Sequence, residues 1–440
     1  MWALKAGSYV LAAAPLGHDE AQYALAARDL LEGVPARWAH VSPGMNAVAV
    51  PGVLAGGSEE ALRGFAMLVA LVFPAGAALL AWRRFGLGVA AWTVALLATA
   101  KPLIRHSADL LSDLPAAALL LLATSFTLSE VTRDDGPRWR FVALGPLAAA
   151  AFYLRYASCV PIALLGVIGL AVGWRQMARR PGPVLVALGL LGVLLVPHAL
   201  DSIKRTGSTL GLLLFNQRVP QSTTSGLETY FTSDPLAFYG GLLAAVALVG
   251  ALAPLWDRSS RVLALWALGL GQVIVLGLVA LGQFRYIFFG VTLLAILGVH
   301  GLTRAWARRA PAARRGLTVA AGALLLGAAV SSAISISKLP ARRRASYADA
   351  MVAAMALRRD AAGRTCYVQT RHATQIEWYS GCSSSYFPAD AQSRGAVIYY
   401  VLDPHDTPEV PMTLPGASRQ VLANERLGIE VRALLPPEAP

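Results

Sequence analysis

Charged residues are scarce in this sequence of 440 amino acids. Asp, Glu, Lys and Arg make up 14% of it and hydrophobic residues 56%, whereas soluble proteins contain about 25% charged residues. This composition excludes an ordinary soluble protein and predicts a polytopic membrane protein. Acidic residues are scarcer than basic ones, which gives a formal net charge of +13. Because the arginines cluster in short links between apolar runs, we interpret this excess as a signal of topology and expect no nucleic-acid partner.

Cysteine is also rare, and Cys159, Cys366 and Cys382 are too few for a disulfide-built scaffold. The last two precede apolar, β-rich runs. In an oxidising compartment they can pair, and the alternative is two separate buried thiols. The sequence shows no internal repeat. No small-residue cleavage site follows the first apolar run, so we expect no cleavable signal peptide.

Apolar runs recur along most of the chain, and about 20 such residues cross a bilayer. We predict about eleven spans, of which the first, third and fifth are short. They lie near residues 3–16, 64–82, 86–101, 112–129, 141–154, 157–174, 184–200, 236–255, 262–282, 286–303 and 316–336.

The arginine-rich links predict the orientation, because short basic links stay on the cytoplasmic side. With eleven spans all five links fall on one side, together with the N-terminus. These links carry Arg83 and Arg84; Arg133, Arg138 and Arg140; Arg175, Arg179 and Arg180; Arg258 and Arg261; and Arg304, Arg308, Arg309, Arg314 and Arg315. Lys338 and Arg342 to Arg344 would then lie outside, which a long translocated domain tolerates.

Two parts follow from this topology: a transmembrane domain, 1–337, with a first extracytoplasmic loop at 17–63, and an extracytoplasmic domain, 338–440. In the loop we predict a helix capped by His18 or Asp19 and ending at Glu32. Its apolar face, with Tyr23, Ala27, Leu30 and Leu31 opposite Arg28, Asp29 and Glu32, would lie on the membrane surface. Turns are expected at Pro43-Gly44, Pro51-Gly52 and Gly56-Gly57.

The C-terminal part reads as a small α/β domain of about 100 residues. Ser346–Arg359 has a helical period with Met351, Met355 and Leu357 on its apolar side. Thr365–Gln369 and Ala396–Leu402 are β-rich, and His372–Tyr379 between them predicts a helix. The expected fold class is therefore an all-α membrane protein with a small α/β extracytoplasmic domain.

Polar residues collect in the links assigned to the outer side. Acidic and basic groups at one rim predict a polar cavity for an anionic substrate carried in the membrane. The candidates are Asp19, Glu20, Tyr23, Lys101, Arg105, His106, Asp109, Asp113, Arg155, Tyr156, Arg285 and Tyr286.

Three hypotheses with their alternatives follow for these residues. Asp19 is placed to act as a general base towards an acceptor hydroxyl, or it is a plain helix N-cap. Asp109 and Asp113 would share a helix face and hold a divalent cation, or Asp109 is solvated and Asp113 caps a span. Arg155 and Arg285, each followed by Tyr, bind a phosphate bidentately or reach to lipid headgroups.

The segment Asp19-Glu20-Ala21-Gln22-Tyr23, with Leu-Glu-Gly at the helix end, resembles the Asp-Glu-x-x-Tyr motif after the first span of GT-C membrane glycosyltransferases. The resemblance is to the branch of protein O-mannosyltransferases and bacterial lipid A aminoarabinose transferases, of the glycosyltransferase family 39 type. It extends to Ser112-Asp113-x-Pro115, Arg155-Tyr156 and Phe284-Arg285-Tyr286. The plan of many spans and a small C-terminal domain is also similar.

The resemblance implies an inverting transferase that moves a hexose or pentose from a polyprenyl-phosphate donor to a lipid, glycan or protein acceptor of the cell envelope. It implies a bacterial inner-membrane protein with its site on the outer face, and Mg or Mn as a candidate cofactor. Asp19 would be the base, Glu20 would support the acceptor or a metal, Asp109 or Asp113 would be the second-loop acid and Arg285 a phosphate contact. The alternatives are a flippase for a lipid-linked anion and a non-catalytic protein of polysaccharide assembly.

Overall fold

The structure, a computed structural model, describes residues 2–34, 38, 41–218, 226–232, 238–279, 282–370, 373–384, 396–402, 418–427 and 429–434. The chain divides into two compact units. The first comprises Met1–Tyr9, Trp38–Val48 and Arg63–Ser337, and the second comprises Val10–Arg37, Ala49–Leu62 and Lys338–Pro440. The predicted boundary after residue 337 coincides with a boundary between units, and the predicted loop 17–63 contributes to both.

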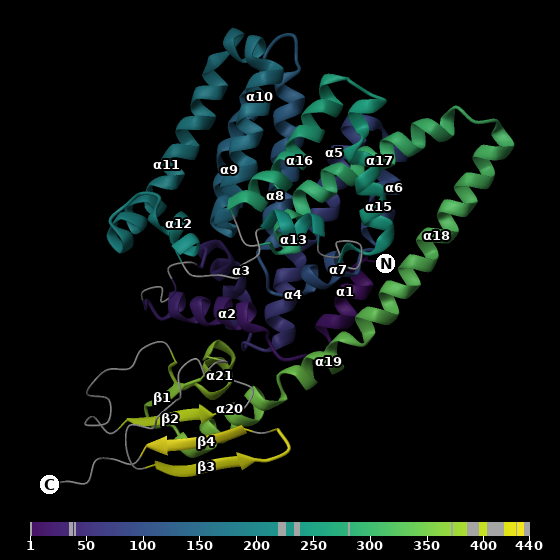
Figure 1. The fold of residues 1–440 in the computed structure, drawn as a ribbon. Helices are drawn as coiled ribbons and strands as arrows, with labels where there is room; N and C mark the ends of the chain where they lie inside the picture. The colour runs from purple at the N-terminus through teal and green to yellow at the C-terminus, as the bar shows by residue number, and fades with distance from the viewer. Residues whose placement is uncertain are drawn as a thin grey trace. The chain divides into compact units, whose positions relative to one another are not determined.

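The first unit is a helical bundle (Figure 1). Its helices are α1 (Trp2–Val10), α3 (Pro43–Leu54), α4 (Glu59–Ala70), α5 (Val72–Phe85), α6 (Leu87–Leu97), α7 (Lys101–Ala108), α8 (Asp113–Val131), α9 (Leu144–Leu154), α10 (Cys159–Arg179), α11 (Pro181–Thr206), α12 (Gly211–Arg218), α13 (Gly226–Thr232), α15 (Gly241–Ala251), α16 (Ser260–Val279), α17 (Phe288–Ala307) and α18 (Pro311–Ser337). Short 3-10 turns are η1 (Trp139–Ala143), η2 (Tyr156–Ser158), η3 (Ala253–Leu255) and η4 (Phe284–Ile287). Helices α3 and α4 also contribute residues to the second unit.

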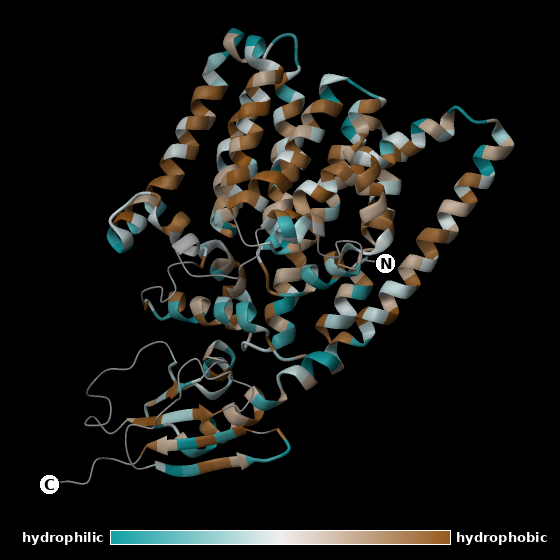
Figure 2. Cartoon of the chain, in the orientation of Figure 1, coloured by the Kyte–Doolittle hydropathy of each residue, from teal (hydrophilic) through white to brown (hydrophobic). Residues whose placement is uncertain are grey.

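Hydrophobic residues, coloured brown in Figure 2, occur along most of the length of the long helices. Within the described part of the chain, seven helical segments are long and apolar enough to cross a membrane, or eight if one bent pair counts as a span. They are Glu59–Phe85, Asp113–Val131, Tyr156–Arg179, Pro181–Thr206, Ser260–Val279, Phe284–Ala307 and Pro311–Ser346, with the bent pair Leu87–Leu97 and Lys101–Ala108. The all-α membrane architecture is confirmed, and the count of eleven spans is not.

The four remaining predicted spans are helical but short or broken. Helix α1 has nine residues, and the helices found for 141–154 and 236–255 are also shorter than a bilayer crossing needs. The run predicted at 86–101 bends by 77° into α7. Pro102 lies in the first turn of α7 and has no N–H to continue the preceding helix, so the chain starts a new one there.

Glycines let the spans of the first unit pack closely. A Cβ at Gly250 of α15 would meet the Leu294 carbonyl of α17, and one at Gly298 of α17 would meet the Val246 carbonyl of α15. Small residues at such crossings allow backbones to approach in the absence of a hydrophobic driving force between helices. Gly250 and Gly298 therefore serve the close packing of α15 and α17.

Turns predicted between residues 43 and 54 are wrong, because this segment forms α3. Pro43 begins the helix, where its missing N–H costs nothing. A Cβ at Gly44 would lie 2.7 Å from the Tyr153 carbonyl, and one at Gly52 would lie 2.7 Å from Leu62 Cα. The two glycines that suggested turns thus serve close packing within a helix.

The second unit contains α2 (His18–Leu31), α19 (Leu339–Ser346), α20 (Ala348–Ala361), α21 (Ala373–Ser380) and a four-stranded sheet. Its strands are β1 (Cys366–Gln369), β2 (Val397–Leu402), β3 (Ser418–Asn424) and β4 (Ile429–Leu434), in the order β1-β2-β4-β3. Strands β1 and β2 are parallel, and the other pairs are antiparallel. The small α/β domain is confirmed, although the sequence pattern missed β3 and β4. His372, the predicted start of α21, lies outside the described residues.

Helix α20 packs its small side chains onto this sheet. Ala350, Ala353, Ala354 and Leu357 are buried with Val368 and Val431 in one cluster. The prediction that Met355 faces the core is wrong, since 52% of it is exposed. Alanines permit a closer approach of helix to sheet than methionines would.

At the domain edge, a hydrogen bond from Arg419 lowers the pKa of the Asp360 carboxyl.

Helix α2 ends as predicted, with Glu32 as its C-cap, but it differs from the prediction at its N-terminus and in its faces. Gly17, not His18 or Asp19, is its N-cap. The predicted apolar face is wrong: Ala27 is buried, Leu30 is 57% exposed, and Asp29, assigned to the polar face, is buried. The helix packs on α21 within the second unit, where Arg28 lies over the Trp378 ring, so protein contacts decide its faces.

Cys366 and Cys382 form a disulfide, which decides between the two alternatives that the sequence left open. They are 16 residues apart, and closing a loop of that length stabilises a fold by about 3 kcal/mol. We expect the double variant Cys366→Ser/Cys382→Ser to unfold at a lower temperature, measured on the full chain in detergent. The free thiol Cys159 supplies the control: Cys159→Ser should retain the wild-type transition, and equal transitions for all three proteins would contradict the prediction.

Candidate functional site

The two ends of α8 carry different chemistry in the first unit. The basic links gather at its Val131 end, and Asp113 begins the other. Phe85, at the end of α5, stacks on His300 of α17 with ring centroids 4.2 Å apart. His300 Nε2 in turn lies 3.5 Å from Asp257, which precedes α16, so the ends of these helices meet. The other contacts are those of Arg84 with Ser129 at 2.9 Å, Arg140 with Glu130 at 2.5 Å, Arg179 with the Asp134 carbonyl at 2.8 Å, and Arg304 with Asp257 at 2.7 Å.

At the other end, Asp113 is buried between two arginines. Its Oδ1 forms an ion pair with Arg155, and its Oδ2 lies 4.0 Å from Arg285 Nη1. The Arg155 guanidinium also lies over the Tyr286 ring, 4.1 Å from its centroid. One carboxylate thus faces two cations. This arrangement brings together Asp113, Arg155, Arg285 and Tyr286, which belong to three separate motifs of the sequence.

Three long helices begin at this cluster. Asp113 opens α8, Arg155 precedes the start of α10 across η2, and Arg285 precedes α17 across η4. Each helix N-terminus carries unpaired backbone N–H groups and the positive end of the helix dipole. The Arg-Tyr pairs therefore precede spans whose first turns converge, and together they favour an anion at this point.

A cavity opens at these helix starts, and its walls combine polar and apolar groups. Besides the charged cluster it is lined by Ser158, Gln272, Phe288 and Phe289. Ser158 is 2% exposed, and its hydroxyl has no hydrogen-bond partner among the described residues. An unsatisfied buried hydroxyl is costly, which makes it a candidate ligand contact. Its volume is about 20 Å³, enough for about one water molecule, so a larger ligand would enter only if these walls moved apart.

Sequence reasoning missed Ser158 and Gln272. Gln272 donates from Nε2 to the Tyr286 carbonyl at 3.3 Å and accepts the Gly290 N–H at 2.5 Å, so it fixes η4 against α16. A single glutamine inside an apolar span is a signal that could have identified it. Ser158 gives no such signal, because serines in spans commonly serve helix packing.

The remaining candidates of the first unit lie outside this cluster. Tyr156 packs against Phe152 and His198, with ring centroids 5.2 and 4.8 Å away. His106 is 7% exposed and packs on Phe288. Lys101 begins α7, and Arg105 in the same helix binds Asp109 at 3.3 Å. The cavity lining includes none of these residues.

Asp109 and Asp113 do not share a helix face, as the metal hypothesis required. Helix α7 ends at Ala108 and α8 begins at Asp113, so the intervening residues are not helical. Asp109 accepts the Tyr9 hydroxyl at 3.0 Å and pairs with Arg105, whereas Asp113 pairs with Arg155. In the described part of the chain no three potential ligands converge. A cation shared by these two carboxylates does not fit, and a requirement for Mg or Mn stays a prediction.

The Asp-Glu motif lies in the second unit, at the start of α2. Glu20 is 1% exposed and pairs with Arg343 at 2.6 Å. Its Oε2 also accepts the Gly17 N–H at 2.7 Å. A Cβ at Gly17 would lie 2.7 Å from Arg343 Nη2, so glycine leaves room for this guanidinium. We interpret Glu20 as the residue that anchors the motif, and its contact with an acceptor stays a prediction.

Asp19 does not cap the helix, since the N-cap is Gly17 and no side chain caps it. This removes the structural alternative considered for Asp19. Its carboxylate is half-buried in the first turn, beside the exposed His18. His18 is held by Thr374, whose hydroxyl lies 3.1 Å from Nδ1, and Tyr23 is half-buried one turn further along α2.

Two comparisons relate the chain to known proteins. A family model described as dolichyl-phosphate-mannose-protein mannosyltransferase matches residues 49–200. No curated protein sequence matches this one. The fold is similar to that of ArnT from Cupriavidus metallidurans in the apo state, with TM-score 0.72 and 17% identity over 98% of this chain and 96% of that one.

ArnT from the same organism bound to undecaprenyl phosphate matches with TM-score 0.72, 16% identity and the same coverage. The Archaeoglobus fulgidus oligosaccharyltransferase matches with TM-score 0.59 and 13% identity, over 91% of this chain and 69% of that one. The predicted resemblance is therefore confirmed in the fold, which is similar to those of ArnT and the oligosaccharyltransferase, and a mannosyltransferase family model matches part of the chain.

Breaking the Glu20–Arg343 pair should unfold the second unit more easily. Removing one partner of a buried pair leaves the other charge uncompensated, which costs about 3–5 kcal/mol. We expect Glu20→Gln to lower the thermal transition of the purified chain markedly. Asp19→Asn changes the neighbouring carboxylate and serves as the control, with a transition close to wild type. A Glu20→Gln protein as stable as wild type would contradict the anchoring role.

Proposed function

We propose that the protein is an inverting glycosyltransferase that uses a sugar linked to a polyprenyl phosphate and transfers it to a lipid, glycan or protein acceptor of the cell envelope. The observation that carries this proposal is the cluster of Arg155, Arg285 and the Ser158 hydroxyl, which lacks a partner in the described chain, at three helix N-termini. A phosphate suits two guanidiniums beside helix N-termini, and a prenyl phosphate would have to widen this cavity of about 20 Å³ to enter it. The similar ArnT structure holds undecaprenyl phosphate, which supports the same class of donor here.

In the proposed reaction the acceptor oxygen or nitrogen forms a bond to the sugar C1 as the C1–O bond to the prenyl phosphate breaks. The bonding electrons leave with the phosphate oxygen. Arg155 and Arg285 stabilise the negative charge that grows there, and Asp113 holds Arg155 in position. Both guanidiniums are largely buried, with side chains 16% and 21% exposed, so little water screens them.

We propose Asp19 as the base that takes the acceptor proton, as the motif resemblance implies. A carboxylate that neither caps its helix nor lies fully buried can gain a proton during the reaction. Glu20 and Gly17 hold the helix turn that carries it.

We place the reaction on the outer face of a bacterial inner membrane. The disulfide Cys366–Cys382 supports an oxidising compartment for the second unit. The basic links at the Val131 end of α8 support a cytoplasmic location for that end. Arg343 is neutralised by Glu20, and Arg344 donates to the Ala12 carbonyl, so these two cations have structural partners despite lying outside.

Asp19→Asn should abolish transfer and leave folding and donor binding intact. The test expresses the variant in a strain lacking the chromosomal gene and follows envelope lipids and glycans by mass spectrometry. We expect a glycan that lacks one sugar and an accumulating prenyl-phosphate sugar. Glu32→Gln, an exposed carboxylate near the C-terminus of the same helix, is the control and should restore the glycan. A normal glycan with Asp19→Asn would refute the assigned base.

Arg285→Ala should weaken binding of undecaprenyl phosphate by about ten-fold or more, since a charge-assisted hydrogen bond to phosphate is lost. Binding is measured by native mass spectrometry on the purified protein. Arg133→Ala, a partly exposed arginine near the other end of α8 that pairs with Asp135, is the matched control and should bind as wild type. Equal affinity of Arg285→Ala and wild type would contradict the donor site.

Ser158→Ala separates binding from folding at the same site. Its hydroxyl has no partner to lose within the described chain, so the variant should be as stable as wild type or slightly more stable. Undecaprenyl phosphate should bind about two- to ten-fold more weakly, as expected for one neutral hydrogen bond. Unchanged affinity would show that this hydroxyl does not contact the ligand.

A further inference from the structure

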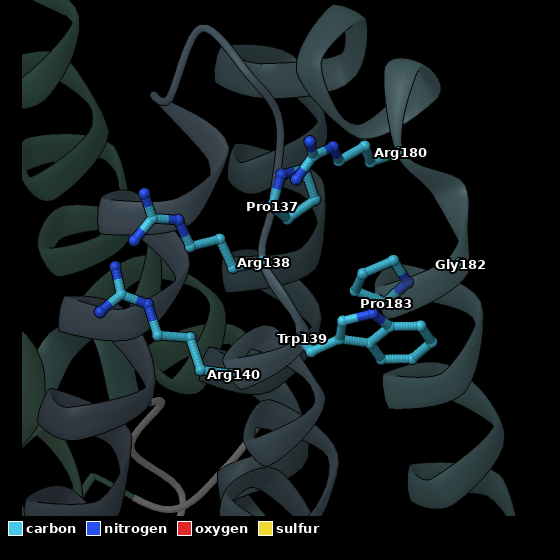
Figure 3. A pocket seen from close by; sticks show the side chains of 7 residues that line it. All are labelled: Pro137, Arg138, Trp139, Arg140, Arg180, Gly182 and Pro183. Carbon is cyan, nitrogen blue, oxygen red and sulfur yellow. The ribbon is translucent and has the colours of Figure 1, made fainter.

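A second groove lies in the first unit at the Val131 end of α8. Its volume is about 670 Å³, and it lies between the turn after α8 and the start of α11 (Figure 3). Helix α8 has 19 residues, so at 1.5 Å per residue it is about 28 Å long and matches the hydrocarbon core of a bilayer. The groove and the donor cavity therefore lie at opposite membrane surfaces.

The groove is strongly basic. Arg138, Arg140 and Arg180 line it, and Arg140 is paired with the buried Glu130 at 2.5 Å. The guanidinium groups of Arg138 and Arg180 form no hydrogen bond or ion pair with any residue that the structure describes. In Figure 3 the side chains of Arg138 and Arg140 extend in the same direction. Two cations are thus left for a ligand, beside the N-terminus of the 26-residue helix α11.

Apolar surface adjoins these charges. Trp139 is 68% exposed and points towards Pro183 of α11 (Figure 3). Along α11, Leu185 and Leu188 are 64% and 59% exposed. Tryptophan is favoured at the level of lipid headgroups, where one end of its ring meets water and the other hydrocarbon. The surface thus matches an amphiphile with an anionic head and apolar chains.

The groove is a fixed feature of the backbone. Gly136 has φ +79°, and a Cβ there would lie 2.8 Å from the Gln176 carbonyl of α10. Beneath it, Val131, Phe141, Met177 and Ala187 form one buried cluster that joins α8, η1, α10 and α11. The arginines consequently project from a packed base and not from a free loop.

We propose that this groove binds the phosphate headgroup of an anionic phospholipid, with the acyl chains along the exposed face of α11. The site is separate from the donor cavity and does not take part in transfer. Basic pockets between spans at the cytoplasmic surface recognise anionic headgroups in this way. A free phosphate shares the head chemistry and lacks the chains, so the experiment distinguishes the two.

The test measures lipid retention by native mass spectrometry on the full chain released from mixed vesicles of phosphatidylglycerol and phosphatidylcholine. Wild type should retain phosphatidylglycerol selectively. Arg138→Ala/Arg180→Ala should retain about ten-fold less, because each arginine contributes to headgroup binding. The control is Arg308→Ala/Arg309→Ala, which removes two exposed arginines from the end of α17 and should behave as wild type. Undecaprenyl phosphate binding by each variant verifies that it is folded.

Three outcomes would overturn the proposal. Equal losses in the two double variants would indicate general surface charge, and no loss in either would exclude the groove. Displacement of phosphatidylglycerol by millimolar inorganic phosphate would show a free-anion site, since an ion without chains cannot replace the contacts along α11. Selective loss in Arg138→Ala/Arg180→Ala that resists inorganic phosphate supports a phospholipid site.

Discussion

The candidate site of the first unit depends on one interaction, the contact of the buried Asp113 carboxylate with Arg155 and Arg285. Charges inside an apolar bundle are costly, and a pair persists only where partners and backbone dipoles compensate it. Here one carboxylate faces two cations, and three helix N-termini lie beside them. These features are the physical basis of the proposal that a phosphate-bearing donor binds here.

The second unit also contains a buried charge that is compensated by a partner, and here the ion pair fixes the start of α2. Glu20 neutralises Arg343 and accepts the Gly17 N–H, so the adjacent carboxylates of the motif have separate duties. One is buried and rigid, and Asp19 beside it stays half-buried. Helix α2 packs on α21, and α21 packs on α20 and β1, so α2 is tied to the core of the second unit. The base proposed for Asp19 would need such support, because a shift of about 1 Å is enough to impair catalysis.

Helix α8 relates the polar features of the first unit to the bilayer. Its first residue lies in the anion cluster, and its last turns meet the basic links through Ser129 and Glu130. One end is thus suited to a reacting lipid phosphate and the other to resident phospholipid. A basic end and an opposite end without such links set the orientation of α8 in the membrane. In our proposals, the donor cavity at the Asp113 end must release its ligand, and the groove at the Val131 end must retain a phospholipid.

The sequence determined the membrane class, most helix positions, the C-terminal α/β domain and the residues of both motifs, because apolar runs, arginine links and Asp-Glu or Arg-Tyr pairs are local features. Only the tertiary structure decided that Asp113 pairs with Arg155 and shares no helix face with Asp109. It also decided that Ser158 is buried without a partner among the described residues, and that Gly17 is the N-cap of α2. The bend before α7 and the helical α3 were likewise beyond the local pattern. Burial, ion pairing and packing depend on contacts between residues that are far apart in the sequence. A single sequence does not show which of these residues are close in space.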